Sequence, residues 1–299
     1  MIGRMRVGLI PQGSGGEERV RVFVDALAVA LSIDVDVHQA ADYRALVSAI
    51  DHELVHFAWL PPLSAARALR SGNIVPAAIA VRHGATSYLT GLITRASSGI
   101  REVSDLRGVR AAWVDRESAS GYVVIRAALR QQGVSLVDAF AEDLFLRSHA
   151  EVARAVDSGR ADVGATCFNV SHGSVQMARS TYNAESTDSY TDRYTAAGGQ
   201  ALTDIHIVAH AGPIPSDIFA VHRSVPTGLL ARLQQALIGA LPASLFDAAK
   251  AMMFADAFAR PEPDHFKMLE NLYDNVIDTR TSIAPSAYPP PLTRPPPRG

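Results

Sequence analysis

An apolar strand followed at once by a serine-rich turn decides the fold and gives the first candidate site. Residues 109–122 read Val-Arg-Ala-Ala-Trp-Val and then Asp-Arg-Glu-Ser-Ala-Ser-Gly-Tyr. The turn leads into a predicted helix over residues 120–132, so hydroxyls and free backbone N–H groups gather at the positive end of a helix dipole. Ser118, Ser120 and Gly121 therefore predict an anion-binding site, with simple helix capping by serine as the alternative.

The same alternation of strand and helix continues on both sides of this stretch. Runs of β-branched residues predict strands, and apolar residues three and four apart predict helices. The pattern is typical of α/β proteins built from parallel βαβ units. Strands are expected at residues 7–10, 33–38, 55–60, 74–81, 89–94, 109–114, 143–146, 161–166, 205–209 and 218–221. Helices are expected at residues 17–32, 42–52, 63–69, 120–132, 148–157, 228–241, 245–254 and 265–276.

Two segments do not follow this alternation. Residues 168–203 are polar, rich in Ser, Thr, Tyr and Gly, and without clear periodicity. We expect a helical fragment and a long loop there. Residues 281–299 are rich in proline and are predicted to be an extended, disordered tail.

Length, charge and cysteine count exclude several classes of protein. The 299 residues predict two domains or one large α/β unit, and the formal net charge of -2 argues against a nucleic-acid partner. A single cysteine, Cys167, excludes an intramolecular disulfide and a cysteine-rich zinc site. Because no leader pattern is visible and Asp25 interrupts the most apolar stretch, we expect a cytoplasmic protein without membrane insertion, or a periplasmic one if the N-terminus is incomplete.

Four further side chains lie where strands meet helices or where the chain would cross between domains. His149 follows Ser148 in a capping box, and its imidazole could contact an anion; an exposed histidine is the alternative. Trp59 and Tyr88 could line a pocket or simply cover a core. Asp162 could accept a hydrogen bond from a ligand or cap a turn. We include all four in the candidate site.

One metal-binding pattern is present, but its context argues against a metal. The residues His52-Glu-Leu-Val-His56 match HExxH, in which two histidines bind zinc from one helix. Here the predicted helix ends near His52, and His56 lies in an apolar run. The nucleotide-binding motifs GxxxxGK[ST] and GxGxxG do not occur. We therefore expect no metal and no cofactor.

Several short segments, in order along the chain, resemble one family. The chain is similar to the PhnD-like substrate-binding proteins of phosphate, phosphite and phosphonate ABC transporters, which have the type II periplasmic-binding fold. The segments are Gly8-Leu-Ile-Pro11, Ala41-Asp-Tyr-Arg-Ala-Leu46, Ser97-Ser-Gly-Ile100, Ser104-Asp-Leu-Arg-Gly108, Asp115–Tyr122, Ser148-His149, Ala155-Val-Asp-Ser-Gly-Arg-Ala-Asp-Val-Gly-Ala165 and Ile214-Pro-Ser-Asp217.

The resemblance implies two α/β lobes, each a mostly parallel sheet flanked by helices, joined by two crossover strands. Lobe 1 would comprise residues 1–87 and 211–280, and residues 88–210 would form lobe 2 as an insertion. It also implies that the lobes close on an anion, and that Asp162 selects a partly protonated oxyanion. Ala119 departs from the family, because a hydroxyl residue is common there. The ligand-binding residues implied are Ser118, Ala119, Ser120, Gly121, His149, Asp162, Trp59 and Tyr88.

Together these observations predict a binding protein rather than an enzyme. We expect a monomer that binds a small oxyanion (phosphate, phosphite or an organophosphonate) and delivers it to an ABC permease. Two alternatives stay open. One is a cytoplasmic enzyme of cofactor biosynthesis on the same fold, with His149 as its acid or base. The other is a cytoplasmic ligand sensor.

Overall fold

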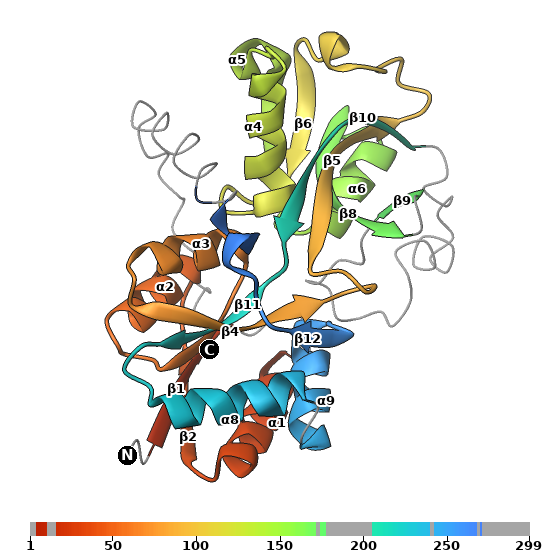
Figure 1. The fold of residues 1–299 in the computed structure, drawn as a ribbon. Coiled ribbons are helices and arrows are strands. Elements are labelled where there is room, and N and C mark those ends of the chain that lie inside the picture. Colours follow the sequence, from red (N-terminus) through yellow and green to blue (C-terminus); the bar gives the residue numbers. More distant parts are fainter. Residues whose placement is uncertain are drawn as a thin grey trace, which may run out of the picture.

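The protein consists of two β-sheets with helices packed against them (Figure 1). The computed structural model describes residues 4–10, 16–171, 174–177, 205–239, 242–267 and 270. We call the sheet at the bottom of Figure 1, with its helices, the lower lobe, and the sheet at the top, with its helices, the upper lobe.

The lower lobe contains both the beginning and the end of the described chain. Its strands are β1 (Arg4–Leu9), β2 (Asp34–Gln39), β3 (Phe57–Leu60), β4 (Ile74–Val81), β11 (Ile218–His222) and β12 (Ala257–Ala259). Its helices are α1 (Gly16–Leu31), α2 (Tyr43–Asp51), α3 (Pro62–Arg70), α8 (Thr227–Ile238), α9 (Ala243–Met253) and the short η4 (Pro263–His265). The strand order is β12-β4-β11-β3-β1-β2, so a strand from late in the sequence lies at the centre of this sheet.

The upper lobe is formed by the middle of the chain. Its strands are β5 (Ser87–Arg95), β6 (Val109–Trp113), β7 (Phe140–Phe145), β8 (Val163–Ser171), β9 (Ser174–Met177) and β10 (Ile205–Pro215). Its helices are η1 (Val103–Asp105), η2 (Ala119–Val123), α4 (Val124–Gln131), α5 (Leu136–Ala139) and α6 (His149–Asp157). The strand order is β10-β5-β8-β6-β7, with β9 paired to β8.

Both sheets are mixed rather than mostly parallel, which corrects one part of the prediction. The parallel pairs join β1 to β2 and β3, and β6 to β7 and β8. The antiparallel pairs arise because the chain enters the upper lobe through β5 and leaves it through the neighbouring β10. It then returns as β11, which runs antiparallel to both β3 and β4. Because the chain passes from the lower lobe to the upper lobe and back again, β10 runs antiparallel to β5, and β11 runs antiparallel to β3 and β4.

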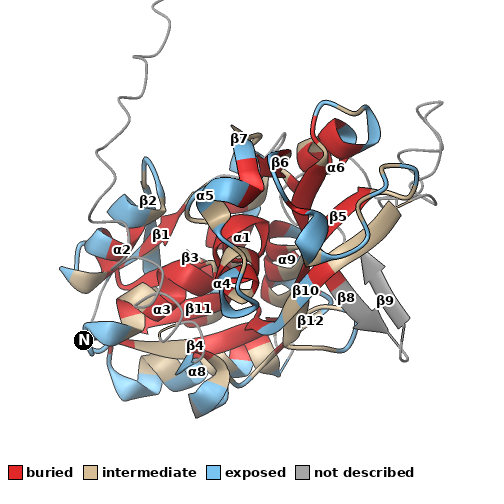
Figure 2. Ribbon diagram, turned by 90° about the horizontal axis from the view of Figure 1, so that it is seen from above, coloured by how far each residue is buried: buried red, intermediate tan, exposed pale blue. Residues whose placement is uncertain are grey.

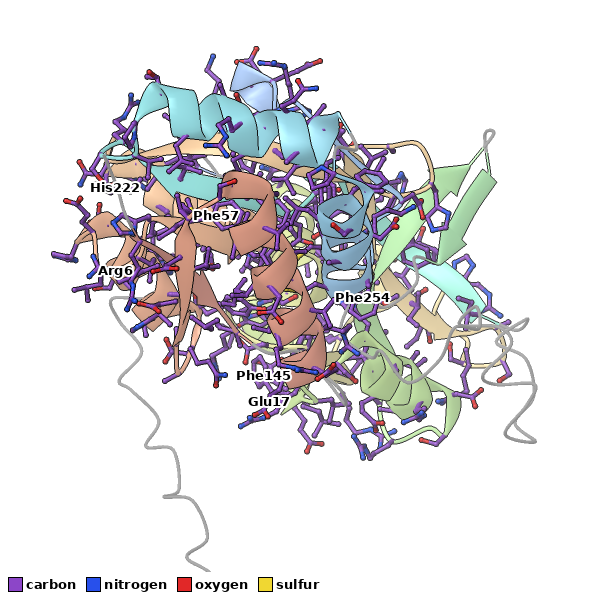
Figure 3. All side chains as sticks on the ribbon, turned by 90° about the horizontal axis from the view of Figure 1, so that it is seen from below. Arg6, Glu17, Phe57, Phe145, His222 and Phe254 are labelled. Carbon is purple, nitrogen blue, oxygen red and sulfur yellow. The ribbon has the colours of Figure 1, made fainter. Side chains whose placement is uncertain are left out.

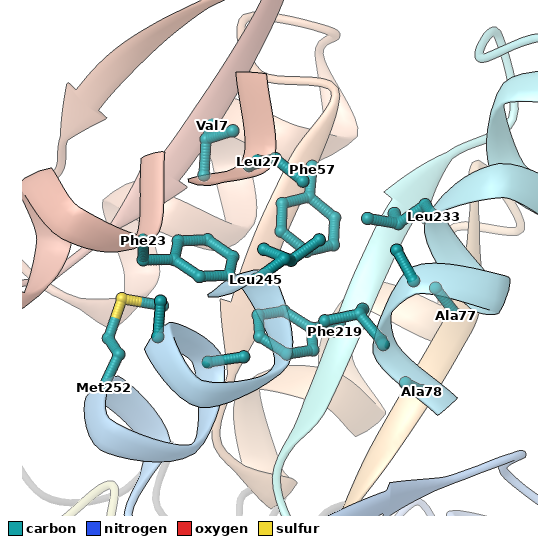
Figure 4. Close-up of a cluster of buried hydrophobic side chains, with 14 of the residues drawn as sticks. Val7, Phe23, Leu27, Phe57, Ala77, Ala78, Phe219, Leu233, Leu245 and Met252 are labelled. Atoms are coloured by element: carbon teal, nitrogen blue, oxygen red, sulfur yellow. The ribbon is translucent and has the colours of Figure 1, made fainter. Parts of the chain in front are cut away.

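Stacked aromatic rings hold α1 on the lower sheet (Figure 4). Phe23 of α1, Phe57 of β3 and Phe219 of β11 have no exposed surface. The Phe57 and Phe219 ring centres lie 4.9 Å apart, and Phe23 lies 5.7 Å from Phe219. Apolar residues recur at three- and four-residue spacing along α1, so its apolar face covers these rings. By contrast, the edge strand β2 is largely exposed (Figure 2).

Helix α3 of the lower lobe also packs against the upper lobe, as its place between the two in Figure 1 indicates. Its buried residues Leu63 and Ala66 belong to the same apolar cluster as Ala119 and Tyr122 of η2. These four residues, which we call the α3 junction, are at most 6% exposed. The two lobes are thus in direct apolar contact in this structure.

Most of the expected elements are present, with two notable differences. Residues 168–171 continue β8, and residues 174–177 form β9, so the helical fragment expected from residue 168 is wrong in this part. The sequence pattern did not reveal α5 or β12. The expected loop over 178–203, the helix beyond residue 270 and the proline-rich tail lie outside the described residues. In the described part of the chain no single helix is long and apolar enough to cross a membrane; only α8 and α9 together meet that test, as a pair bent by 74°.

Candidate functional site

The serine-rich turn caps a helix that begins as a π-helical turn and continues into α4. The Ser118 Oγ accepts a hydrogen bond from the Gly121 N–H at 3.0 Å. Gly121 is required by packing, because a Cβ there would lie 2.4 Å from a methyl carbon of Val114. The capping alternative therefore holds for Ser118. A hydroxyl can donate one hydrogen bond while it accepts another, so capping does not remove Ser118 as a donor.

Ser120 and Tyr88 are brought together from different parts of the chain. Ser120 lies beside the Tyr88 phenol, and the Ser120 carbonyl oxygen accepts from the Thr90 Oγ1 at 2.6 Å. Ser120 is only 3% exposed. Burial raises the pKa of the Tyr88 phenol, and the negative charge of Asp217 raises it further. The Tyr88 hydroxyl is therefore a neutral hydrogen-bond donor at physiological pH.

His149 is buried at the first turn of α6, which overturns the exposed-histidine alternative. Ser148 caps this helix through its Oγ, which accepts from the Glu151 N–H at 3.1 Å. The His149 side chain is 4% exposed, and its Nδ1 lies 3.2 Å from the Thr166 Oγ1. Burial lowers the pKa of His149 to about 4. The imidazole is therefore neutral near pH 7 and would act on an anion through a hydrogen bond rather than a full charge.

These residues lie at one edge of the upper sheet. Because β6 and β7 are parallel, the turn after β6 and the start of α6 after β7 emerge at the same edge. The chain of η2 also touches β5 and β8, which carry Tyr88 and Thr166. We call Ser118, Ser120, Gly121, Tyr88 and His149 the upper-edge cluster.

Asp162 is not brought together with these residues. It precedes β8, so it lies at the opposite edge of the sheet, and its carboxylate accepts from the Arg110 Nη2 at 2.8 Å and Nε at 3.1 Å. Its Oδ2 also accepts from the Arg110 backbone N–H. These hydrogen bonds, with the charge of Arg110, hold the pKa of Asp162 below its usual value. Its contacts stabilise the start of β8 and give it no place in the cluster.

Trp59 lines a pocket in the lower lobe. Its ring packs edge-on against Phe219 with ring centres 4.7 Å apart. The pocket encloses about 460 Å³ of empty space, open solvent included. Part of its wall comes from Phe254 at the end of α9, which Figure 3 shows beside α1. Its lining residues are Leu9, Ile10, Gly16, Arg19, Val20, Trp59, Arg82, Asp217, Met252, Met253 and Phe254.

Asp217 and Arg82 are functional candidates that the sequence reasoning missed. The Arg82 Nη2 donates to the Asp217 Oδ2 at 2.7 Å, and their side chains are 14% and 11% exposed. Both residues lie where the chain crosses between the lobes, and both line the pocket. Asp217 also belongs to Ile214-Pro-Ser-Asp217, one of the segments that carried the resemblance. Asp217 could have been found from the sequence, because it follows Pro215-Ser216 at the point where the chain was expected to cross between the lobes.

The HExxH residues do not form a metal site. Helix α2 ends at Asp51, His52 Nδ1 lies 2.9 Å from the Ser48 carbonyl oxygen, and His56 Nδ1 accepts from the Arg6 N–H. Across the residues that the structure describes, no three His, Cys, Asp or Glu side chains are grouped as metal ligands would be.

Comparison with known proteins places this geometry in one family. A family model described as "ABC transporter, phosphonate, periplasmic substrate-binding protein" matches residues 7–264. Among solved structures, XAC2383 from Xanthomonas citri bound to ATP is 21% identical with a TM-score of 0.71, covering 94% of this chain and 99% of that chain. PhnD1 from Prochlorococcus marinus, in complex with methylphosphonate, is 15% identical with a TM-score of 0.67, covering 92% and 98%.

A binding protein component of an ABC phosphonate transporter from Pseudomonas aeruginosa is also similar. It is 17% identical with a TM-score of 0.65, covering 93% of this chain and 87% of that chain. At such identities the likeness establishes the fold, which confirms the predicted α/β class and its type II periplasmic-binding arrangement.

The family match bears on two further predictions. Its members bind solutes and are not enzymes, so the expectation of a non-enzyme is confirmed and the enzyme alternative is excluded. The family is periplasmic, so the comparison does not support the expected cytoplasmic location. The chain belongs to the family of periplasmic substrate-binding proteins of phosphonate ABC transporters.

Proposed function

We propose that the chain binds a small oxyanion, namely phosphate, phosphite or an organophosphonate, between its lobes at the upper-edge cluster. The observation that carries this proposal is the convergence of Ser120, Tyr88 and His149 at one sheet edge. Ser120 and Tyr88 lie side by side, and His149 is buried and neutral. These side chains come from three separate segments, which favours a site over isolated helix caps.

The cluster supplies what an oxyanion needs without a buried cation. Residues 119–131 form one continuous helical segment, so the N–H groups of the serine turn and the positive end of a dipole face the same place. The Tyr88 hydroxyl and the neutral His149 ring add donors. Asp162 takes no part, so the proposal includes no carboxylate that selects the protonated anion.

The ligands of two similar structures support a phosphorus oxyanion. Methylphosphonate is bound to PhnD1, and ATP is bound to XAC2383. Both carry tetrahedral phosphorus with oxygen atoms around it. We infer that this group sits at the upper-edge cluster, while Trp59 and the pocket in the lower lobe face any organic part of the ligand.

The same proposal includes the division into lobes and the partner. Lobe 1 would be residues 1–87 and 211–280, and lobe 2 residues 88–210. The passage from the lower to the upper sheet between β4 and β5, and back between β10 and β11, supports the insertion of one lobe into the other. We infer that a monomer delivers the ligand to an ABC permease.

Calorimetry with the purified protein tests the ligand class. We expect at least one of phosphate, phosphite, methylphosphonate and ATP to bind. Ser120→Ala removes a buried donor, so the affinity of the bound anion should fall roughly 10- to 150-fold, equivalent to about 1.5–3 kcal/mol for a charge-assisted hydrogen bond.

Ser135→Ala is the matched control, because Ser135 is exposed at the start of α5 and its side chain makes no cap hydrogen bond. Its affinity should equal that of the wild type. Absence of binding across the whole panel, or equal affinities for the Ser120 and Ser135 variants, would show that the anion site has been placed wrongly.

A further inference from the structure

The serine-rich turn carries an acidic residue that reaches into the other lobe. Glu117 directly precedes Ser118, and each of its carboxylate oxygens accepts from a different arginine. Arg44 Nη2 of α2 donates to Oε1 at 2.5 Å, and Arg67 Nη2 of α3 donates to Oε2 at 2.9 Å. Both arginines belong to the lower lobe, so these two ion pairs connect the lobes.

The contact is partly buried and lies beside the α3 junction. Glu117 and Arg67 side chains are 23% and 22% exposed, whereas Arg44 is 67% exposed. Leu63, Ala66 and Arg67 share one face of α3, because they are three and four residues apart. The apolar contact of α3 with η2 and the Arg67–Glu117 ion pair therefore lie side by side. When α3 packs against η2, Arg67 comes within reach of Glu117.

The charges show that Glu117 is tied to the arginines rather than exposed to solvent. Its burial alone would raise the pKa of this carboxyl, but Arg44 and Arg67 outweigh burial and lower it. Glu18 pairs with Arg21 on α1 and Arg110 pairs with Asp162, each within one lobe, and Arg82 pairs with Asp217 at the crossings between the lobes. Glu117 differs because it spans from the turn to two helices of the opposite lobe.

We propose that Glu117 is a positioning residue for the oxyanion site. It fixes the turn that carries Ser118 and Ser120 against α2 and α3 and so holds the lobes together around the site. This inference rests on the proposed function, although the tie itself is independent of the ligand's identity. Separation of the lobes to release a ligand must break both ion pairs.

If Glu117 acted on the anion only through its charge, Glu117→Gln would have the opposite effect on binding from the one that a positioning role predicts. A carboxylate near an anion repels it, so Glu117→Gln should tighten anion binding if charge alone matters. If Glu117 positions the turn, the same substitution should speed ligand release despite the lost repulsion. We expect the dissociation rate of methylphosphonate, followed by tryptophan fluorescence in a stopped-flow instrument, to rise about 2- to 5-fold in E117Q, a change within the range of exposed ion pairs.

A control variant and a second variant distinguish loss of the Glu117 ion pairs with Arg44 and Arg67, which we call the Glu117 tie, from a folding defect. Glu18→Gln removes an exposed ion pair within α1 and should leave the rate unchanged. Arg67→Gln should also speed release, and E117Q/R67Q should be no faster than E117Q, because E117Q already breaks the ion pair with Arg67. An unchanged or slower rate in E117Q, or additive effects in the double variant, overturns the proposal.

A measurement without ligand keeps this test separate from the proposed function. Val29 of α1 and Val137 of α5 are 74% and 89% exposed, and Cys167 is buried, so cysteines at the two valines can carry a dye pair. At low salt we expect the unliganded wild type to show shorter dye separations than E117Q, with the difference removed by about 0.5 M salt through screening. Equal separations at low salt refute the tie. If the tie is seen but no anion binds, the proposed function alone fails.

Discussion

At the scale of single residues, the upper-edge cluster consists of groups that carry no charge. Burial keeps the His149 ring neutral and the Tyr88 hydroxyl protonated, and Ser120 is uncharged at any pH. Fixed neutral donors surround an anion without the large desolvation cost of a buried cation. Exchange of one such donor for an apolar group should therefore weaken binding without exposing an unpaired charge.

The buried His149 should make the protein less stable in mild acid. Its pKa is lowered from 6.5 to about 4, so below pH 6.5 the unfolded chain takes up a proton that the folded protein does not. The stabilisation is complete above pH 6.5 and is lost as the pH falls toward 4, by up to about 3 kcal/mol. His149→Gln should flatten the dependence of the urea midpoint on pH across this window. His38→Gln, at an exposed position of β2, should leave it unchanged; equal slopes in the wild type and H149Q would contradict this.

The sequence predicts which edge of the sheet a residue lies at when one considers whether the residue follows or precedes its strand. Ser118 and His149 follow parallel strands and lie at the same edge. Asp162 precedes its strand, and that position alone places it at the opposite edge, paired with Arg110. The packing need for Gly121 against Val114 could not be predicted, because it depends on how closely the π-helical turn approaches the residue that follows β6.

At the scale of elements, α3 connects the two lobes. Its apolar face is shared between the lower sheet and the η2 helix, so one short helix contributes to two packing layers. The sequence predicted the helix and its bounds within one residue. It did not predict that Leu63 faces the other lobe, because periodicity identifies an apolar face but not what covers it.

Leu63→Ala tests this shared packing. Leu63 is 3% exposed within the α3 junction, so the substitution leaves a cavity and should lower the free energy of unfolding by about 2–5 kcal/mol. Val137→Ala, on a side chain that is 89% exposed, should change it by less than about 0.5 kcal/mol. Urea denaturation compares the two. A Leu63 variant as stable as the Val137 variant would mean that the junction contributes nothing to stability.

At the scale of the whole molecule, an ion pair connects the two segments in which the chain crosses between the lobes. Arg82 follows β4, Asp217 precedes β11, and their ion pair joins the outgoing and returning segments. Arg82 also donates to the carbonyl oxygens of Met253 and Phe254 at the end of α9. A resemblance in motif order predicted two crossings, but the pairing of their side chains required the structure.

Asp217→Asn tests this fastening. It leaves Arg82 nearly buried without its carboxylate, so the free energy of unfolding should fall by about 3 kcal/mol. Asp264→Asn is the matched control, since Asp264 is 84% exposed in its pair with Lys267 and should cost less than about 1 kcal/mol. Scanning calorimetry gives both values. Similar melting temperatures for the two variants would rule out a stabilising role for the crossover pair.

The central place of β11 in the lower sheet has a consequence for the order in which the protein is made. The ribosome completes β1 to β4 early, but the strand that must lie between β3 and β4 is translated only after the whole upper lobe. The first part of the nascent chain therefore waits with its two halves of a sheet unjoined, while the inserted part already has every strand from β5 to β10. Residues 218–222 join the two parts of the lower sheet, and the lobe that begins the sequence is the last to be finished.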